Sequence, residues 1–218
     1  MFNLTLSFDN GPELETTPMV LEILARRGLR TTFFVIGEKL AQCERRMLAE
    51  RAHSEGHWIG NHSYTHTTPL GVLRNPDIAE REIGRVQEII GTLAHPKKFF
   101  RPVGGGGNLD RRLLNPHIVD FLVNGHYTCV LWNAIPHDWD DPEGWVARAL
   151  AQCQAQPWTL MVLHDLPTGA MHQLDRFLDG IAEAGGRVLQ DFPPSCLPIV
   201  EGTIVQALDD YVTLDPPT

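Results

Sequence analysis

Hydrophobic and polar positions follow two alternating patterns along this chain. Short apolar runs typical of strands are separated by longer stretches with apolar residues at helical spacing. We expect strands at residues 4–8, 31–36, 57–61, 98–102, 128–133, 159–163 and 187–189. We expect helices at residues 17–27, 38–54, 76–93, 110–124, 143–154 and 172–184. This alternation predicts an α/β fold with parallel strands and helical crossovers, either a barrel or an open doubly wound sheet.

Size and composition narrow the class of protein. The chain has 218 residues, of which 43% are hydrophobic and 21% charged, so we expect a single domain over 1–218 with a sizeable core. A net charge of -9 argues against nucleic acid as the main partner, because phosphate binding needs a basic face. The proline-rich extension 190–218 predicts irregular structure. The sequence leaves open whether it covers the barrel bottom, rims the mouth or meets another subunit.

Targeting patterns and cysteine usage point to an intracellular protein. No apolar run approaches the ~18 residues of a membrane span, and no basic segment with an apolar core opens the chain. We therefore expect a cytoplasmic location and no membrane partner. The four cysteines form no Cys-x-x-Cys pair, which favours reduced core or surface thiols. The sequence gives no indication of the oligomeric state.

Polar residues capable of chemistry follow the ends of five predicted strands. They are Asp9, Asn10, His62, His66, Arg101, Asp138 and His164. In parallel α/β folds the C-terminal strand ends and the loops after them build the active site. We therefore expect these side chains to meet at one mouth.

Two of these residues have the spacing of metal ligands. His62 and His66 lie four positions apart, so a helical turn would place both imidazoles on one side, where they could hold one metal ion. Such a site needs a third protein ligand and an open position for water. Asp9 and Asn10 offer a carboxylate and an amide oxygen after the first strand. Histidines at this spacing also often cap turns, so the pattern alone leaves both interpretations open.

Five segments together resemble the polysaccharide deacetylase family (NodB-like, carbohydrate esterase family 4). Residues 7–12 look like its TFDDGP segment and residues 60–66 resemble its NHTxTH segment; residues 100–102, 132–139 and 160–164 are similar to its RPPYG, DxxDW and LxLH segments. They occur in the family's order over most of the chain. The resemblance implies a deformed (β/α)7 barrel and hydrolysis of a non-peptide carbon–nitrogen bond, the N-acetyl amide of an amino sugar or oligosaccharide.

The resemblance also implies roles for the site residues. Asp9 matches the general base that takes a proton from the attacking water, and Arg101 matches the arginine that orients this base. His62 and His66 match metal ligands, with Asn10 at the position of the third ligand. Asp138 and His164 match the pair in which the carboxylate keeps the imidazole protonated for the leaving amine. The implied cofactor is a divalent metal ion, zinc in the first instance.

Three departures from the family pattern keep alternatives open. Asn10 replaces an aspartate ligand, which predicts weaker zinc binding or none. Residues 103–107, with four glycines, replace the Pro-Tyr-Gly part of the arginine segment, and residues 135–137 lack the usual additional aspartate. Two alternatives therefore remain: a metal-free amidohydrolase acting on a small cyclic amide or ureide, and a non-catalytic barrel that binds a sugar or a protein. The retained Asp9, Arg101, Asp138 and His164 favour catalysis, since a pure binder needs no proton-transfer groups.

Aromatic residues add a possible sugar-binding surface. Tryptophan rings stack on sugars, but they are more often part of a core. The candidates are Trp58, Trp132, Trp139 and Trp145. The sequence does not choose among them.

Overall fold

The computed structural model describes residues 1–213, so Pro216 and Pro217 of the predicted extension lie outside the described residues. Its strands are β1 (Phe2–Asp9), β2 (Thr32–Val35), β3 (Trp58–Asn61), β4 (Phe99–Phe100), β5 (Thr128–Cys129), β6 (Trp158–His164), β7 (Gly186–Leu189), β8 (Ile199–Val200) and β9 (Thr203–Ile204). Its α-helices are α1 (Thr16–Arg26), α2 (Gly37–Leu40), α3 (Cys43–Ser54), α4 (Arg85–Ile90), α5 (Pro116–Asn124), α6 (Trp145–Gln154) and α7 (Leu174–Glu183). A π-helical turn, Glu80–Gly84, precedes α4. The predicted α/β class is thus confirmed.

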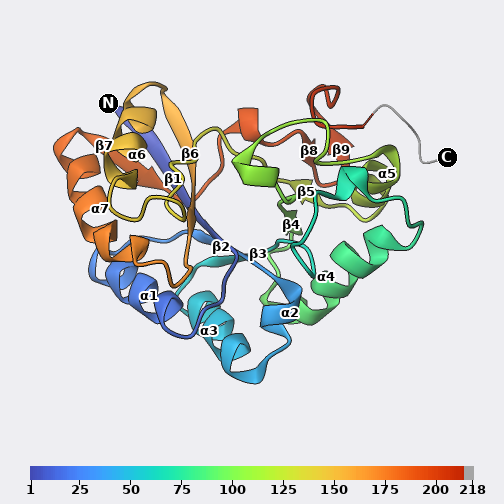
Figure 1. The fold of residues 1–218 in the computed structure, drawn as a ribbon, viewed down its shortest axis with the longest axis horizontal. Helices are drawn as coiled ribbons and strands as arrows, with labels where there is room; N and C mark the ends of the chain where they lie inside the picture. Colours follow the sequence, from blue (N-terminus) through green and yellow to red (C-terminus); the bar gives the residue numbers. More distant parts are fainter. Residues whose placement is uncertain (214–218) are drawn as a thin grey trace.

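The strands form one curled sheet with the helices on its outside (Figure 1). Strands β6, β1, β2, β3, β4 and β5 are neighbours in that order and parallel, and β7 pairs with the first half of β1. A bridge between Ala134 and Met161 brings the segment after β5 back to β6. The result is the deformed (β/α)7 barrel that the family resemblance implies.

The side chains of β1 show how the pattern of the sequence builds two layers. Leu4, Leu6 and Phe8 are fully buried and pack with the surrounding helices. Thr5, Ser7 and Asp9 have the opposite parity, so they point to the barrel interior, because successive strand residues face opposite sides of a sheet. The strand therefore delivers a carboxylate to the inside of the barrel at its C-terminal end.

Several predicted elements are shorter or later than the sequence pattern indicates. The helix expected at 38–54 is broken between α2 and α3, and the strands expected at 98–102 and 128–133 shrink to two residues each. The helix expected at 110–124 begins at Pro116, because the side chain of Asn115 accepts a hydrogen bond from Ile118 N and caps it. These differences concern boundaries rather than the order of elements.

The C-terminal extension is part of the barrel. Gln190 Nε2 donates to the carbonyls of Thr31 and Gly56, at the N-terminal ends of β2 and β3. The ring of Phe192 packs on Trp58 and Phe99 at the same end. Strand β8 then pairs antiparallel with β5, and β9 pairs antiparallel with β8. The extension thus closes the barrel bottom, which leaves the opposite end as the mouth.

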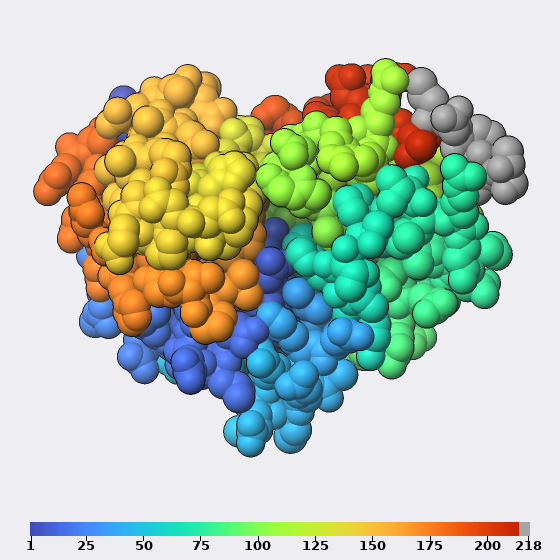
Figure 2. All heavy atoms as spheres, in the orientation of Figure 1, coloured from blue at the N-terminus to red at the C-terminus, as the bar shows by residue number. Residues whose placement is uncertain are grey.

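The mouth is visible as a hollow between two lobes in Figure 2, with the dark blue N-terminal segment at its base.

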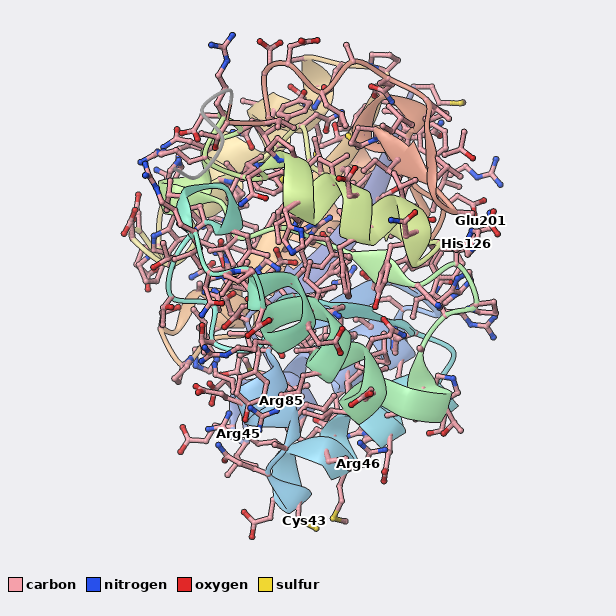
Figure 3. The ribbon with its side chains drawn as sticks, turned by 90° about the vertical axis from the view of Figure 1, so that its right-hand side faces the viewer. Cys43, Arg45, Arg46, Arg85, His126 and Glu201 are labelled. Carbon is pink, nitrogen blue, oxygen red and sulfur yellow. The ribbon has the colours of Figure 1, made fainter. Side chains whose placement is uncertain are left out.

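No helix within residues 1–213 is long and apolar enough to cross a membrane. The cytoplasmic location stays a prediction. All four cysteines are free thiols, as expected; Cys43 is exposed at the lower edge of Figure 3, whereas Cys129, Cys153 and Cys196 are buried.

The buried position of Phe192 generates a stability prediction. Phe192→Ala should lower the free energy of unfolding by about 3 kcal/mol, because it removes a ring from the closed end of the barrel. Chemical denaturation of the full chain measures this value. The control Ile204→Ala, at a residue that is 51% exposed, should stay within about 0.5 kcal/mol of the parent. A Phe192→Ala value equally small would show that the extension is not part of the folded unit.

Candidate active site at the barrel mouth

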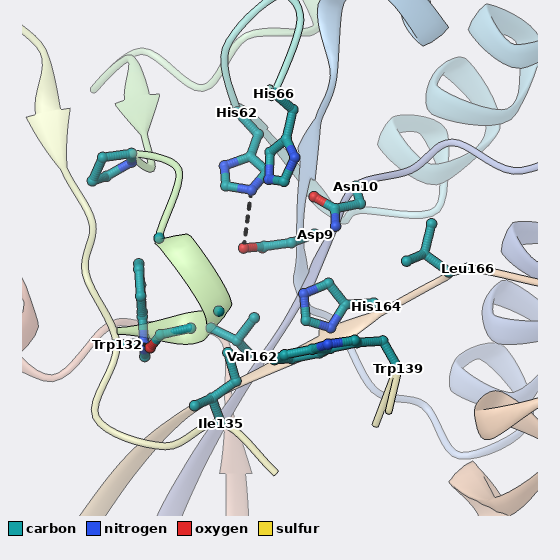
Figure 4. Close-up of a pocket in the computed structure, with 14 residues that line it drawn as sticks. Asp9, Asn10, His62, His66, Trp132, Ile135, Trp139, Val162, His164 and Leu166 are labelled. Atoms are coloured by element: carbon teal, nitrogen blue, oxygen red, sulfur yellow. Dashed lines mark hydrogen bonds and ion pairs between the residues drawn. The ribbon is translucent and has the colours of Figure 1, made fainter. Parts of the chain in front are cut away.

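The structure brings the seven predicted site residues together at the mouth. A cavity of about 240 Å³ is lined by Asp9, Asn10, His62, His66 and His164 (Figure 4). Pairing of β1 with β6 sets Asp9 directly opposite His164 in register. The two remaining residues, Arg101 and Asp138, lie behind this layer and contact Asp9 and His164. Five of the seven side chains thus line the cavity, and the other two support them from behind.

Asp9 is held by an arginine inside the barrel. The guanidinium of Arg101 has no exposed surface, and its Nη1 donates to Asp9 Oδ1 at 2.8 Å and to Ser7 Oγ at 2.6 Å. Its Nε and Nη2 donate to the carbonyls of Val130 and Leu131. This is not the ordinary surface ion pair that such residues often form. Asp9 Oδ1 is fixed, and Oδ2 is left toward the cavity.

Arg101 also orients His62. The backbone carbonyl of Arg101 lies 2.9 Å from His62 Nδ1, and a carbonyl only accepts, so Nδ1 carries the proton. Burial lowers the pKa of His62 to about 3, which keeps the ring neutral. Its Nε2 then presents a lone pair toward Asp9 Oδ2, 3.5 Å away. Two acceptors therefore face each other across the cavity, an arrangement that needs a donor or a cation between them.

His66 lies beside His62, but not on the helical turn that the spacing suggested. The segment 62–66 is a loop in which Ser63 and His66 have φ values of 66° and 54°. The ring centroids of the two histidines are nevertheless 4.6 Å apart. Burial lowers the pKa of His66 to about 3 as well, so both imidazoles are available as neutral ligands.

Asn10 completes a set of donors suited to a cation. Its Oδ1 is buried without a hydrogen-bond partner, and the residue lines the same cavity as His62 and His66. An unpaired buried acceptor is costly unless a ligand satisfies it. Within residues 1–213 no group of three or more His, Cys, Asp or Glu side chains is placed to hold a metal ion, so the third ligand would be this amide oxygen. The residues present fit a divalent metal ion with two nitrogen ligands and one neutral oxygen ligand.

His164 faces Asp9 from the neighbouring strand and is paired with a second carboxylate, that of Asp138. Asp138 is fully buried, and its two oxygens accept from His164 Nδ1 and from the His164 backbone N–H, each at 2.9 Å. Burial alone lowers the pKa of His164, but the hydrogen bond and charge of Asp138, with Asp9 and Asp165, raise it above its ordinary value. His164 is thus held as a proton donor, in contrast to the neutral His62 and His66.

The walls of the cavity are aromatic and glycine-rich. Trp139 lies edge-on to His164 with centroids 4.7 Å apart, and Trp132 Nε1 donates to the carbonyl of Gly107. A Cβ on Gly104 would lie 2.7 Å from the Trp132 indole, so the loop can approach this ring only as glycine. The other two candidate tryptophans are elsewhere: Trp145 is fully buried and packs on Phe177 of α7, and Trp58 lies at the barrel bottom.

Asp165 is a functional candidate that the sequence analysis missed. It is fully buried directly after His164, accepts a hydrogen bond from Thr17 Oγ1, and burial raises its pKa to about 6. A Cβ on Gly11 would lie 2.3 Å from its Oδ2, so only glycine fits beside it. Asp165 thus packs closely against the turn that carries Asn10. The His-Asp dipeptide at a strand end was the available indication.

The fold and this arrangement define a barrel hydrolase whose mouth carries carboxylate, imidazole and amide groups suited to acid–base chemistry and to a cation. The chain belongs to the polysaccharide deacetylase family, whose model matches residues 3–115. It is 28% identical over 189 residues to the peptidoglycan-N-acetylglucosamine deacetylase of Bacillus cereus, covering 84% of this chain and 65% of that protein. It is 31% identical over 181 residues to the chitooligosaccharide deacetylase of Rhizobium leguminosarum bv. phaseoli, covering 79% of this chain and 74% of that protein. The chain thus spans just under two thirds of the first relative.

A solved structure agrees with the fold. The family 4 carbohydrate esterase from Streptomyces lividans, in complex with acetate, superposes with a TM-score of 0.73 at 26% identity, over 90% of this chain and 96% of that one. Its family has the deformed (β/α)7 barrel and is generally metal-dependent.

The pairing of His164 with Asp138 generates a prediction for protonation. The pKa of His164, followed by NMR titration, should lie above the ordinary ~6.5, and Asp138→Asn should lower it, because the variant removes the charge of the carboxylate that accepts from Nδ1. Because folding raises this pKa, the pair stabilises the protein below the ordinary histidine pKa, and the stabilisation is lost as pH rises through the raised value. Asp140→Asn, at an exposed neighbouring carboxylate, is the control. An unchanged His164 pKa in Asp138→Asn would contradict the assignment.

Proposed function

We propose that this protein hydrolyses the acetamido group of an N-acetylated amino sugar or oligosaccharide and releases acetate. The observation that carries the proposal is that a proton acceptor, Asp9, and a proton donor, His164, face the same cavity. Asp9 has one oxygen fixed by Arg101 and one free, and His164 is prepared as a proton donor by Asp138. A binding protein needs neither.

Each side chain then has one task in the reaction. Asp9 Oδ2 accepts the proton of the attacking water, while Arg101 keeps the carboxylate oriented. His164 donates a proton to the nitrogen of the leaving amine through Nε2, because its Nδ1 is occupied by Asp138. Proton acceptor and proton donor lie on neighbouring strands, so water can attack from one side of the amide while the amine leaves on the other.

We propose zinc as the divalent ion, held by His62, His66 and Asn10. When bound it polarises the amide carbonyl and lowers the pKa of water. The amide of Asn10 is neutral, whereas a carboxylate ligand would add a negative charge to the site. The affinity for zinc should therefore be modest.

The walls support a sugar as the substrate. Trp132 and Trp139 offer faces for a pyranose ring, and the cavity is also lined by Ile135, Val162 and Leu166, which suit an acetyl methyl group. The relatives are named for deacetylation of chitooligosaccharides and of peptidoglycan N-acetylglucosamine, which suggests both substrate classes. We favour soluble oligosaccharides, because they suit the predicted cytoplasmic location; nucleic acid and membrane are not expected partners, and oligomeric state stays open.

A metal-free hydrolysis is the second candidate, and Asn10 favours it. Without a charged third ligand, Asp9 and Arg101 could act on an unliganded water against a small cyclic amide. A chelator distinguishes the two proposals: acetate release that survives chelation, or turnover only of cyclic amides, would support this second candidate.

The direct test is acetate release from N-acetylglucosamine oligomers by the zinc-supplemented protein. Asp9→Asn keeps an oxygen for Arg101 but removes the base, so kcat should fall by about 10²–10⁴. The control Asp120→Asn makes the same charge change at an exposed position on α5 and should keep full activity. Thermal unfolding verifies that Asp9→Asn is folded. A wild-type protein inactive on both chitooligosaccharides and peptidoglycan fragments, or a fully active Asp9→Asn, would contradict the proposal.

The third ligand generates a separate prediction. Asn10→Asp should raise zinc affinity about tenfold or more, ~1.4 kcal/mol, because it adds a formal charge next to the ion. Competition with a chromogenic chelator measures this. Asn124→Asp, exposed at the end of α5, should leave affinity unchanged. If Asn10→Asp binds zinc no more tightly than the parent, Asn10 is not a ligand.

A further inference from the structure

The loop that carries the two histidines has a backbone conformation that needs support. Ser63 and His66 both have left-handed φ values, 66° and 54°, which non-glycine residues adopt only at some expense. His62 is fixed by the carbonyl of Arg101, whereas no residue within 1–213 makes such a hydrogen bond to the ring of His66. What holds His66 must therefore act through the loop backbone.

One face of the loop is held by α2. The N–H groups of Gly37 and Glu38 donate to the carbonyls of Ser63 and Tyr64, each at 3.0 Å. This satisfies carbonyl groups and leaves the loop N–H groups to another partner. That partner is Glu82, in the π-helical turn Glu80–Gly84.

Glu82 accepts hydrogen bonds from the N–H groups of the loop. Its Oε2 accepts from Tyr64 N at 3.0 Å and from Thr65 N at 2.9 Å, and its Oε1 accepts from Thr65 Oγ1 at 3.0 Å. The residue is only 7% exposed. Three hydrogen bonds to a buried carboxylate are charge-assisted and strong, so they fix the two residues directly before His66.

The helix that carries Glu82 is shaped to reach the loop. Glu82 lies at the centre of the π-helical turn Glu80–Gly84, a form that occurs mostly as short bulges at functional sites. Within the same turn, the carbonyl of Ile83 accepts from Asn61 Nδ2, while Asn61 Oδ1 accepts from Ser63 N. The turn therefore holds the loop at two points, one on each side of His62.

We propose that Glu82 is the positioning residue for His66, and through it for the metal site. It touches neither substrate nor metal and acts only through the amides of Tyr64 and Thr65. The inference rests on the proposed function, because it assumes that His62 and His66 bind a divalent ion. Its expected consequence is a loss of metal affinity rather than a general loss of stability.

The test compares variants of the full chain for zinc affinity, measured by competition with a chromogenic chelator. Glu82→Ala removes all three acceptors and should weaken zinc binding about 10- to 100-fold, the range for partners that orient metal ligands. Glu82→Gln keeps an oxygen for the two amides and an amino group toward the Thr65 hydroxyl, so its affinity should stay within about threefold of the parent. Glu80→Ala, at an exposed acid in the same turn, should have no effect.

A second readout separates positioning from destabilisation. The d–d absorption spectrum of the cobalt-loaded protein should change in Glu82→Ala and return in Glu82→Gln, which a stability change alone would not produce. If Glu82→Ala does not fold, Glu82→Asp retains the charge with a shorter reach and should show an intermediate loss.

The outcomes separate this inference from the proposed function. A wild-type protein that binds zinc, with Glu82→Ala (or, if that variant does not fold, Glu82→Asp) equally tight and spectrally unchanged, would overturn the role of Glu82 alone. A wild-type protein that binds neither zinc nor cobalt would overturn the metal site and this inference with it. Zinc binding without acetate release would overturn the proposed substrate and leave the role of Glu82 intact.

Discussion

The ion pair between Arg101 and Asp9 is the interaction on which the rest of the structure depends. A guanidinium with no exposed surface is tolerated only when its donors are satisfied, and here Ser7, Asp9, Val130 and Leu131 accept from it. These partners belong to β1 and to the segment after β5, so one side chain joins these two parts of the barrel. Loss of one partner of such a pair typically costs about 3–5 kcal/mol.

The same residue organises the chemistry. Its side chain fixes one oxygen of Asp9, and its backbone carbonyl fixes the tautomer of His62. The cavity therefore contains a carboxylate oxygen, an imidazole lone pair and the unpaired amide oxygen of Asn10, all acceptors. On the other side His164, paired with Asp138, supplies a proton donor. This division between acceptors and donor is what an amide hydrolase needs, and it arises from register and burial.

Much of this arrangement could be predicted from the sequence, for a definite reason. Parallel strands align their C-terminal ends, so Asp9, Arg101 and His164 had to approach one another once the strand–helix alternation was identified. The helical turn expected for the two histidines was wrong, because the loop is shaped by contacts from α2 and from Glu82, which are distant in sequence. Glu82 itself falls on the apolar stripe of its helix, and an acid at such a position was the one available indication. Strand β5 was overestimated because the apolar residues Val130, Leu131 and Trp132 continue beyond its hydrogen-bonded part.

Metal content tests the central claim most directly. The central claim is that the cavity lined by Asp9 Oδ2, His62 Nε2 and the unpartnered Asn10 Oδ1 is a cation site. Elemental analysis of the full chain, after dialysis against zinc and removal of free ion, should therefore give about one zinc per chain, and His62→Ala should reduce it to near zero. A parent protein that retains no zinc or other divalent ion under these conditions would contradict the account.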